Sequence, residues 1–156
     1  MQDAVVNGEL TITIPEGFKV LDSEGLKELY NDDNADRWGM MDDQRQMVLS
    51  VFWHKNGGLV SFLAKPKDVC LSTEKKLSKA LKDYGYELEG FYEKDLCGKK
   101  ACGFRHIHTI TGIEYTSEVT QIMQGRVCYT IYAYSRSDNE TENRPVLNEI
   151  LDGMKF

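Results

Sequence analysis

Two histidines, His106 and His108, are the residues whose type and spacing most readily suggest chemistry. They lie two apart in a stretch that predicts a β-strand, so both imidazoles point to one face of a sheet and could share a metal ion or another ligand. The alternative is a pair of surface imidazoles on a solvated sheet face. The sequence therefore offers His106 and His108 as candidate ligand-binding residues.

Cys97 and Cys102 stand just upstream, and the segment CGKKACGFRHIH superficially resembles a zinc pattern. A strand rises about 3.3 Å per residue, which separates Cys102 from His106 by about 13 Å. A Zn–S bond is only about 2.3 Å long, so these two side chains do not share one zinc ion. The pattern places no further ligand, and we expect no stoichiometric zinc in the purified protein.

An alternation of oxygen ligands, Asp32-x-Asn34-x-Asp36, resembles the opening of a calcium loop. Arg37 stands where such a loop needs a turn glycine, and the twelfth position holds Asp43 in place of the longer glutamate. A cation at the turn opposes a bound cation, so the pattern favours a polar loop after a helix. We expect no bound calcium and no cofactor.

The four cysteines, Cys70, Cys97, Cys102 and Cys128, contain no C-x-x-C spacing. This argues against a thioredoxin-like site or a zinc ribbon. Cys70 falls on an apolar helix stripe and Cys128 in an aromatic-rich strand, both ordinary positions for buried reduced cysteine. Cys97 and Cys102 flank a tight turn and could face each other, and they would form the disulfide if the chain were exported. We expect four free thiols.

Lysines gather along the long helix expected in the middle of the chain. From 65 to 82 there are six lysines and two acidic residues, in a protein whose net charge is −6. Lys75, Lys79 and Lys82 lie opposite the apolar stripe of that helix. This face is either ordinary solvated surface or a docking patch for an acidic partner, and it is our candidate partner-binding surface.

Hydrophobic periodicity predicts the elements that must position these residues, in the order ββαββαββββα. We expect strands at 10–14 and 18–21, a helix at 22–30, a hairpin of strands 37–41 and 45–54, a helix at 68–84, strands at 86–95, 101–110, 114–123 and 127–134, a polar loop at 136–143, and a last helix with Pro145 in its first turn and Gly153 at its end. The joints between the last four strands are too short for parallel crossovers, so these strands form an antiparallel meander.

The last strand also indicates how the sheet is covered. Tyr129 has the opposite parity to Tyr132 and Tyr134, so aromatic side chains face both sides. We therefore expect an α+β fold, an antiparallel β-sheet with helices packed on both faces in an α/β/α sandwich. The 156 residues suit a single domain spanning 1–156.

Composition and missing motifs exclude several classes of function. The chain has 25 acidic and 19 basic residues, so we expect neither nucleic acid nor an anionic membrane as the main partner. No apolar run is long enough for membrane insertion. The start lacks the features of an export signal, so we expect a cytoplasmic protein, or alternatively an exported one whose signal peptide has been removed. Dinucleotide, P-loop, nucleophile-elbow and zinc-protease motifs are absent.

Several stretches of the chain resemble one known family. They are the opening ITIPEGFKVL, the central hairpin, the long helix ending in Gly85, the L-x-G-K-K-A turn at 96–101 and the closing LNEILDGMKF. In this order they resemble the Mog/PsbP-like superfamily, in its uncharacterised bacterial branch. The resemblance implies the α/β/α sandwich. It also implies a non-enzymatic role, because one better-known member binds the nuclear-transport GTPase Ran and another is an extrinsic photosystem II subunit.

Three classes of function remain open. We predict a non-catalytic protein-interaction or adaptor module with an unknown protein partner, present as a monomer or weak dimer. The first alternative is a small-molecule or metal-binding protein that uses the sheet face of His106 and His108. The second alternative is an enzyme of a chemistry that the motifs above do not cover.

Overall fold

The computed structural model describes residues 1–30, 36–55 and 65–156. Its elements are β1 (Gln2–Val6), β2 (Leu10–Ile14), β3 (Lys19–Val20), α1 (Ser23–Tyr30), β4 (Arg37–Asp42), β5 (Met47–Lys55), α3 (Pro66–Ala80), the 3₁₀ turn η1 (Lys82–Tyr84), β6 (Glu87–Leu96), β7 (Lys99–Ile110), β8 (Ile113–Gln124), β9 (Val127–Arg136), the 3₁₀ turn η2 (Ser137–Asn139) and α4 (Glu140–Asp152).

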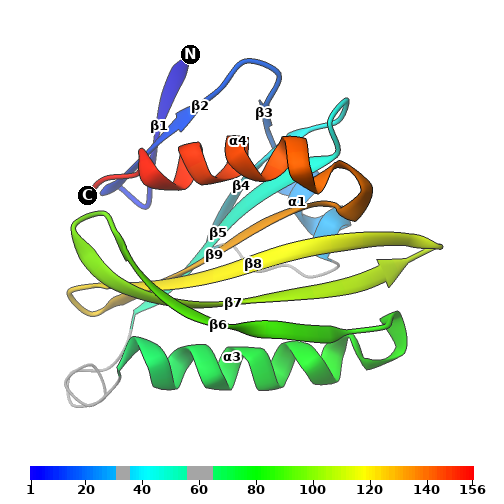
Figure 1. Ribbon diagram of the computed structural model, residues 1–156. Coiled ribbons are helices and arrows are strands. Elements are labelled where there is room, and N and C mark those ends of the chain that lie inside the picture. The colour runs from blue at the N-terminus through cyan, green and yellow to red at the C-terminus, as the bar shows by residue number, and fades with distance from the viewer. Residues whose placement is uncertain (31–35, 56–64) are drawn as a thin grey trace.

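The main sheet is antiparallel and runs in the order β3-β4-β5-β9-β8-β7-β6. The predicted meander from β6 to β9 is confirmed, each strand pairing with the next through a short turn. The predicted β4–β5 hairpin joins this meander because β5 pairs with β9 along its whole length. The α+β class is therefore confirmed, with layers on both sides of the sheet (Figure 1).

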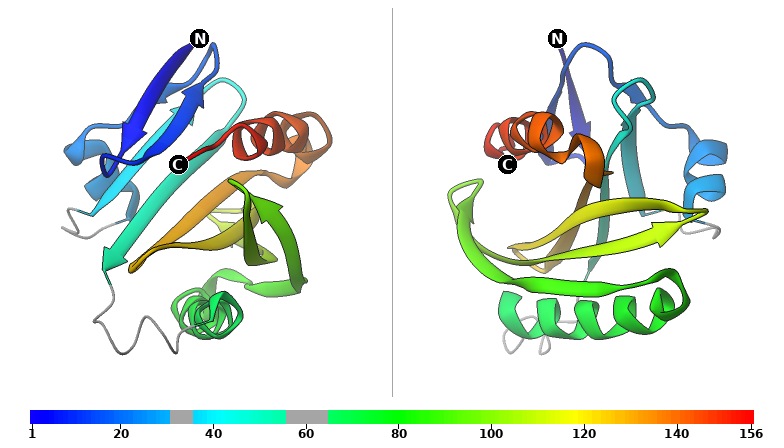
Figure 2. Two further views of the ribbon diagram at one scale, coloured as in Figure 1. Left: turned by 90° about the vertical axis from the view of Figure 1, so that its left-hand side faces the viewer. Right: turned by 45° about the vertical axis from the view of Figure 1, so that its right-hand side comes forward.

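One face of the sheet, here called the α4 face, is covered by α4 and by the β1–β2 hairpin (Figure 2). The alternation predicted for β2 sets this packing, because Leu10 and Ile12 are fully buried while the intervening Thr11 is not. They pack in one cluster with Ile131 of β9 and Leu147 of α4. This cluster is the main hydrophobic core.

The opposite face, here called the α1–α3 face, is covered by α1 and α3. The buried side of α1 is Leu26, which packs so closely over Gly39 of β4 that a Cβ there would lie 2.9 Å from the leucine. α3 packs through Cys70, which lies in a small cluster with Phe104 and Val119. The structure thus has two separate apolar clusters, one on each face.

The first strand, β1, was not among the expected elements. Its signal is the Asn7-Gly8 pair between two apolar stretches, which is the strongest short-range indication of a tight hairpin. Both residues adopt the positive φ that such a turn requires, 51° and 71°. The strand itself is mostly exposed, so its residues carry little of the alternation that reveals β2.

The expectation that Pro145 lies in the first turn of the last helix is wrong. α4 begins at Glu140, so Pro145 lies inside the helix and removes one main-chain hydrogen bond. Buried polar residues just before it explain the earlier start. Asn143 donates to two acceptors, at 2.7 and 2.8 Å, and Arg144 donates to two main-chain carbonyls of the sheet at 3.1 and 3.2 Å.

Candidate functional site

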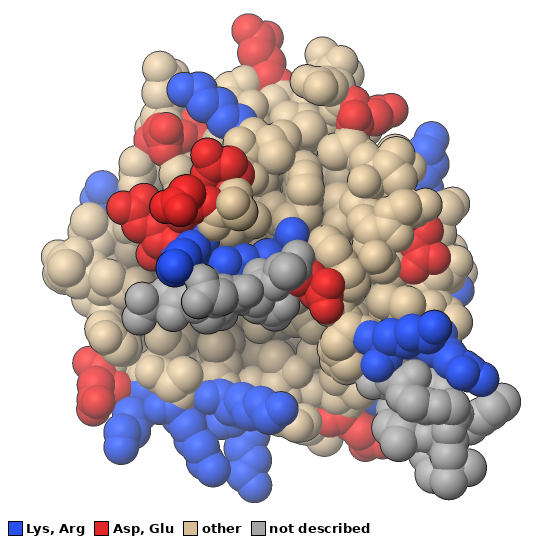
Figure 3. Space-filling view, turned by 180° about the vertical axis from the view of Figure 1, so that it is seen from behind, with Lys and Arg blue, Asp and Glu red and all other residues tan. Residues whose placement is uncertain are grey.

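Between α1 and α3, the sheet is left with an open cavity of about 320 Å³. Figure 3 looks onto this face, whose surface is hollowed above the lysine side chains of α3. Strands β5, β7, β8 and β9 form the floor, and the two helices form the sides. The lining residues are mostly aromatic or aliphatic: Leu29, Tyr30, Phe52, Leu77, Leu81, His106, His108, Ile110, Ser117, Tyr132 and Tyr134.

Both candidate histidines lie in this cavity wall. The prediction that they share one face is confirmed, since their rings are 5.3 Å apart between centroids. The interpretation as surface imidazoles on a solvated face is wrong, because the exposed fractions are 2% for His106 and 9% for His108. Tyr86 stacks on His106 at 4.9 Å and Tyr115 on His108 at 5.7 Å, which explains the burial.

Burial also sets the charge of these imidazoles. It lowers the pKa of His106 to about 4, and the neighbouring His108 shifts it in the same direction. Burial lowers the pKa of His108 as well. Both rings are therefore neutral at pH 7, and each has one N–H donor and one acceptor nitrogen. In neither ring does Nδ1 have a hydrogen-bond partner among the described residues.

The phenol groups of Tyr30, Tyr132 and Tyr134 also line the cavity. The hydroxyl of Tyr30 bonds to the hydroxyl of Ser50 on β5. Burial raises the pKa of Tyr132 to about 12 and raises those of Tyr30 and Tyr134. All three phenols thus stay protonated near neutral pH and can donate a hydrogen bond.

Sequence reasoning named the histidines but missed the residues around them. Ser117 lies opposite His106 in the β7–β8 register and opposite Tyr134 in the β8–β9 register. The parity of each strand would have placed these side chains on one face. The position of Tyr30 could not be predicted in this way. It reaches the cavity from α1, which is far in sequence from strands β7 to β9, and periodicity within one element does not show which distant elements pack together.

The donor set does not suit a metal ion. Among residues 1–30, 36–55 and 65–156 there is no group of three or more His, Cys, Asp or Glu side chains that could hold one. Asp32 and Asn34 of the calcium-loop pattern lie outside the described residues. The cavity chemistry is therefore that of neutral donors and acceptors between aromatic walls.

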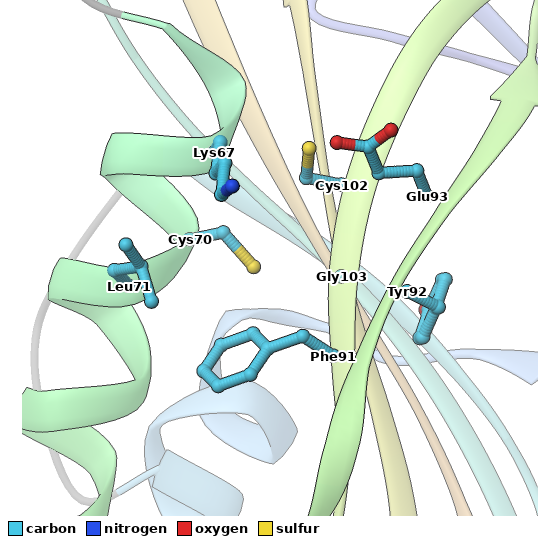
Figure 4. Close-up of a pocket in the computed structure, with 8 residues that line it drawn as sticks. All are labelled: Lys67, Cys70, Leu71, Phe91, Tyr92, Glu93, Cys102 and Gly103. Carbon is cyan, nitrogen blue, oxygen red and sulfur yellow. The ribbon is translucent and has the colours of Figure 1, made fainter.

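A second cavity, of about 440 Å³, lies between α3 and the strands β6 and β7 (Figure 4). The thiols of Cys70 and Cys102 line it, and Lys67 and Glu93 are exposed residues at its border. Burial raises the pKa of Cys70 to about 12, with a smaller contribution from Cys102, and burial also raises the pKa of Cys102. Thiols that stay protonated are poor nucleophiles.

The prediction that Cys97 and Cys102 could face each other is wrong. Cys97 occupies the turn after β6, where it packs against the core of the α4 face. Cys102 packs into the cluster on the α1–α3 face. The turn residue Cys97 has a positive φ of 55°, so it does not continue the strand alternation. Its side chain therefore lies on the α4 face, opposite to that of Cys102. All four cysteines are free in this structure.

The lysine face of α3 and the following turn consists of Lys75, Lys79 and Lys82, with Lys76 on its flank. All four side chains are exposed, and Figure 3 shows basic side chains gathered along the lower edge, where α3 runs. The nearest helix carboxylate, Glu74, accepts a hydrogen bond of 2.8 Å from Tyr86.

Comparisons with known proteins show the fold. No family model and no curated protein matches the chain. The solved structure of the PsbP protein of Synechocystis sp. PCC 6803 (CyanoP) is similar with a TM-score of 0.73 at 13% identity, covering 98% of this chain and 90% of that one. The Ran-binding protein Mog1p of Saccharomyces cerevisiae has a TM-score of 0.56 at 10% identity, with coverages of 94% and 84%.

A third similar structure is LpqN of Mycobacterium tuberculosis, which is involved in cell envelope biogenesis, with a TM-score of 0.53 at 15% identity and coverages of 99% and 90%. At identities this low, similarity shows the arrangement of the chain and not its function. In the described part of the chain no helix is long and apolar enough to cross a membrane. The predicted resemblance is confirmed, and the chain has the Mog/PsbP-like fold.

Proposed function

We propose that the protein is a non-catalytic interaction module that captures an acidic protein partner through the lysine face of α3. The observation that carries this proposal is the exposure of Lys75, Lys79 and Lys82 on one side of the molecule, although its net charge is −6. Their side chains form no ion pair with any residue that the structure describes.

Helix geometry makes this arrangement unfavourable for the protein alone. Lys75 and Lys79 are four residues apart on the helix and therefore adjacent on its surface, where like charges cost a few tenths of a kcal/mol. Glu74 and Asp68 are the acidic residues of α3. Glu74 is engaged with Tyr86, and Asp68 lies near the other end of the helix. An acidic partner surface would remove this repulsion, and charges of this kind mainly raise the association rate.

The rest of the molecule supports a role in binding over a role in catalysis. The thiols of Cys70 and Cys102 are buried and protonated, and the imidazoles of His106 and His108 are buried and neutral. No described carboxylate lines the cavity that both imidazoles share, although His108 also borders a neighbouring cavity with Glu28, Asp42 and Asp43. Ser117 lies opposite His106 in the cavity wall, but Nδ1 of His106 has no hydrogen-bond partner among the described residues. No hydroxyl is therefore bonded to this nitrogen, as activation by a base would require. One protein with a similar fold is a Ran-binding protein, which agrees with the use of this fold as a binding module.

Charge reversal tests the proposal. The variant Lys75→Glu/Lys79→Glu/Lys82→Glu is compared with Lys19→Glu/Lys100→Glu/Lys155→Glu, which changes the net charge equally at exposed lysines elsewhere. Each immobilised protein is exposed to a soluble extract of the source organism, and the retained proteins are identified and then purified. We expect a discrete acidic partner that wild type and the control variant bind alike, and that the lysine-face variant binds at least tenfold more weakly.

Salt provides a second readout. The partner's affinity for wild type should fall as ionic strength rises, because screening shortens the reach of surface charges. Equal affinity of the lysine-face variant and the control variant for the purified partner would overturn the proposal. A partner whose binding does not respond to salt would overturn it too.

A further inference from the structure

We propose that the cavity between α1 and α3 is a binding site for a small, uncharged, planar aromatic molecule that carries a hydrogen-bonding edge. This inference is independent of the lysine face, which lies on the outer side of α3. It rests on the shape of the cavity wall, on its unpartnered buried polar atoms and on its lack of charge.

The apolar wall suits a flat ring. Phe52 contacts Tyr30 and Tyr132 edge-on, with ring centroids 5.0 and 5.4 Å apart and interplanar angles of 87° and 82°. Rings held at right angles leave faces and edges free for a third ring, and aromatic groups prefer such offset or edge-to-face contacts. Leu77 and Leu81, on the α3 side, provide an aliphatic part of the cavity wall.

Two buried nitrogen atoms beside the cavity have hydrogen-bonding capacity that the protein does not use. His106 and His108 are more than nine-tenths buried, and Nδ1 of each lacks a partner among the described residues. An unsatisfied buried polar atom costs about 1–3 kcal/mol, so a ligand toward which either imidazole turns its Nδ1 atom recovers free energy. Ser117 and Tyr134 line the same cavity, and the side chain of Tyr134 interacts with Tyr30. Their hydroxyls provide further polar contacts for one edge of a ligand.

Charge and size limit the class of ligand. The described lining residues include no Asp, Glu, Lys or Arg, and both imidazoles are neutral near pH 7. An ion moved into such surroundings loses its hydration without a counter-charge, at a cost of several kcal/mol. The volume of about 320 Å³ lies at the lower end of the range for ligand pockets, which suits one or two fused rings.

The test uses three naphthalene derivatives of nearly equal size. 2-Naphthol is uncharged and has a hydrogen-bonding edge, naphthalene lacks that edge, and 2-naphthoate is an anion at pH 7. Titrations follow the side-chain nitrogen NMR signals of the three histidines. We expect 2-naphthol to shift the signals of His106 and His108 saturably, while the exposed His54 stays unchanged. Naphthalene should bind at least tenfold more weakly, and 2-naphthoate should not bind.

Variants locate the site. His106→Phe keeps a ring but removes both nitrogens. It should therefore lower the affinity for 2-naphthol about tenfold and leave the affinity for naphthalene unchanged. Ser117→Leu should fill part of the cavity and lower the affinity for both compounds. Leu71→Ala, which alters the thiol cavity of Cys70 and Cys102, should change neither.

Three results would overturn the inference. They are the absence of saturable shifts in wild type, equal binding of 2-naphthol and 2-naphthoate, and binding of 2-naphthol that Leu71→Ala weakens but Ser117→Leu does not. The wild-type titration decides the question even if a cavity variant does not fold.

Discussion

On the α4 face the buried polar side chains are bonded, whereas the α1–α3 face holds the buried polar atoms that lack partners. Asn143 on the α4 face donates to two acceptors, and Arg144 on the same face donates to two main-chain carbonyls of the sheet. Nδ1 of His106, Nδ1 of His108 and Oε1 of Gln121 are the described buried side-chain atoms without a partner, and all three lie on the α1–α3 face. The two cavities described above, of about 440 and 320 Å³, lie on that face as well.

A single strand shows how the sequence produces this difference. On β9, Ile131 and Ala133 face α4 and are at most 1% exposed, and Tyr129 on the same side has its hydroxyl bonded to Asn7 and Glu9. Tyr132, one residue on from Ile131, faces the open cavity. Alternate residues therefore serve different purposes, and we infer that one face provides stability while the other is left able to bind.

The largest expected loss of stability comes from truncating a core side chain on the α4 face. Leu147→Ala removes a fully buried side chain of the main core, and such a change costs about 2–5 kcal/mol of unfolding free energy. Leu77→Ala is the matched change on the α1–α3 face. It should cost less than about 2 kcal/mol, because Leu77 is only partly buried and already borders a cavity. Urea unfolding of both variants measures the difference, and equal losses would contradict the contrast between the faces.

The next effect concerns a buried charge. Arg144 contacts Glu140 and Glu118, and Arg105 bonds to the same two carboxylates. Removing one partner from a buried ion pair costs about 3–5 kcal/mol, but Arg105 continues to neutralise the glutamates here. We therefore expect Arg144→Leu to cost about 3 kcal/mol, at the lower end of that range. The loss should grow when Arg105→Leu is added, which a double-mutant cycle would detect.

Lowering the pH should destabilise the protein, because the buried His106 on the α1–α3 face resists protonation. The pKa of His106 is about 4 in the folded protein and 6.5 for the free side chain. The unfolded chain therefore binds more protons between these values, so stability falls as pH decreases from 6.5 and the loss is complete below 4. From pH 7 to pH 5 this one group accounts for about 2 kcal/mol.

His106→Phe should remove this part of the pH dependence, while the exposed His54→Gln should retain it. Unfolding in urea at pH 7, 6 and 5 measures the slope for each protein. An unchanged slope in His106→Phe would contradict the burial of a neutral imidazole.

Local patterns predicted much of the fold and part of the site. The alternation of Leu10, Ile12 and Ile14 gave both the strand and its buried side, and the two-residue spacing gave His106 and His108 a common face. Burial of that pair could not be predicted, because it depends on Tyr86 and Tyr115 and on helices placed by long-range packing. Pairing of β5 with β9 likewise joins segments about eighty residues apart, which no local pattern reports.

The early start of α4 shows a different failure. Asn143 and Arg144 are polar, and polar residues before a proline favour a loop in a sequence pattern. Their side chains are buried because acceptors on the sheet and on the β4–β5 turn meet them. Hydrophobic periodicity has no means of finding a helix turn that is held by hydrogen bonds.

The smallest expected effect concerns the thiols, and it leaves stability unchanged. Three of the four cysteines are buried, and burial raises the pKa of Cys70 to about 12 and that of Cys128 to about 11. Their thiolate fractions near neutral pH are therefore about a hundredfold or more below that of a free thiol. Cys97 is only partly buried, so alkylation of the native protein should modify it first.

Cys102 should follow Cys97, because it is 7% exposed whereas Cys70 and Cys128 are each 1% exposed and it borders the thiol cavity. Peptide mass spectrometry after timed alkylation gives this order, and Cys97→Ser should abolish the fast step. In denaturant without reductant, four thiols should react. Two reactive thiols there would indicate a disulfide. Labelling of Cys70 in the native state as fast as that of Cys97 would contradict the burial of its thiol, which is 1% exposed.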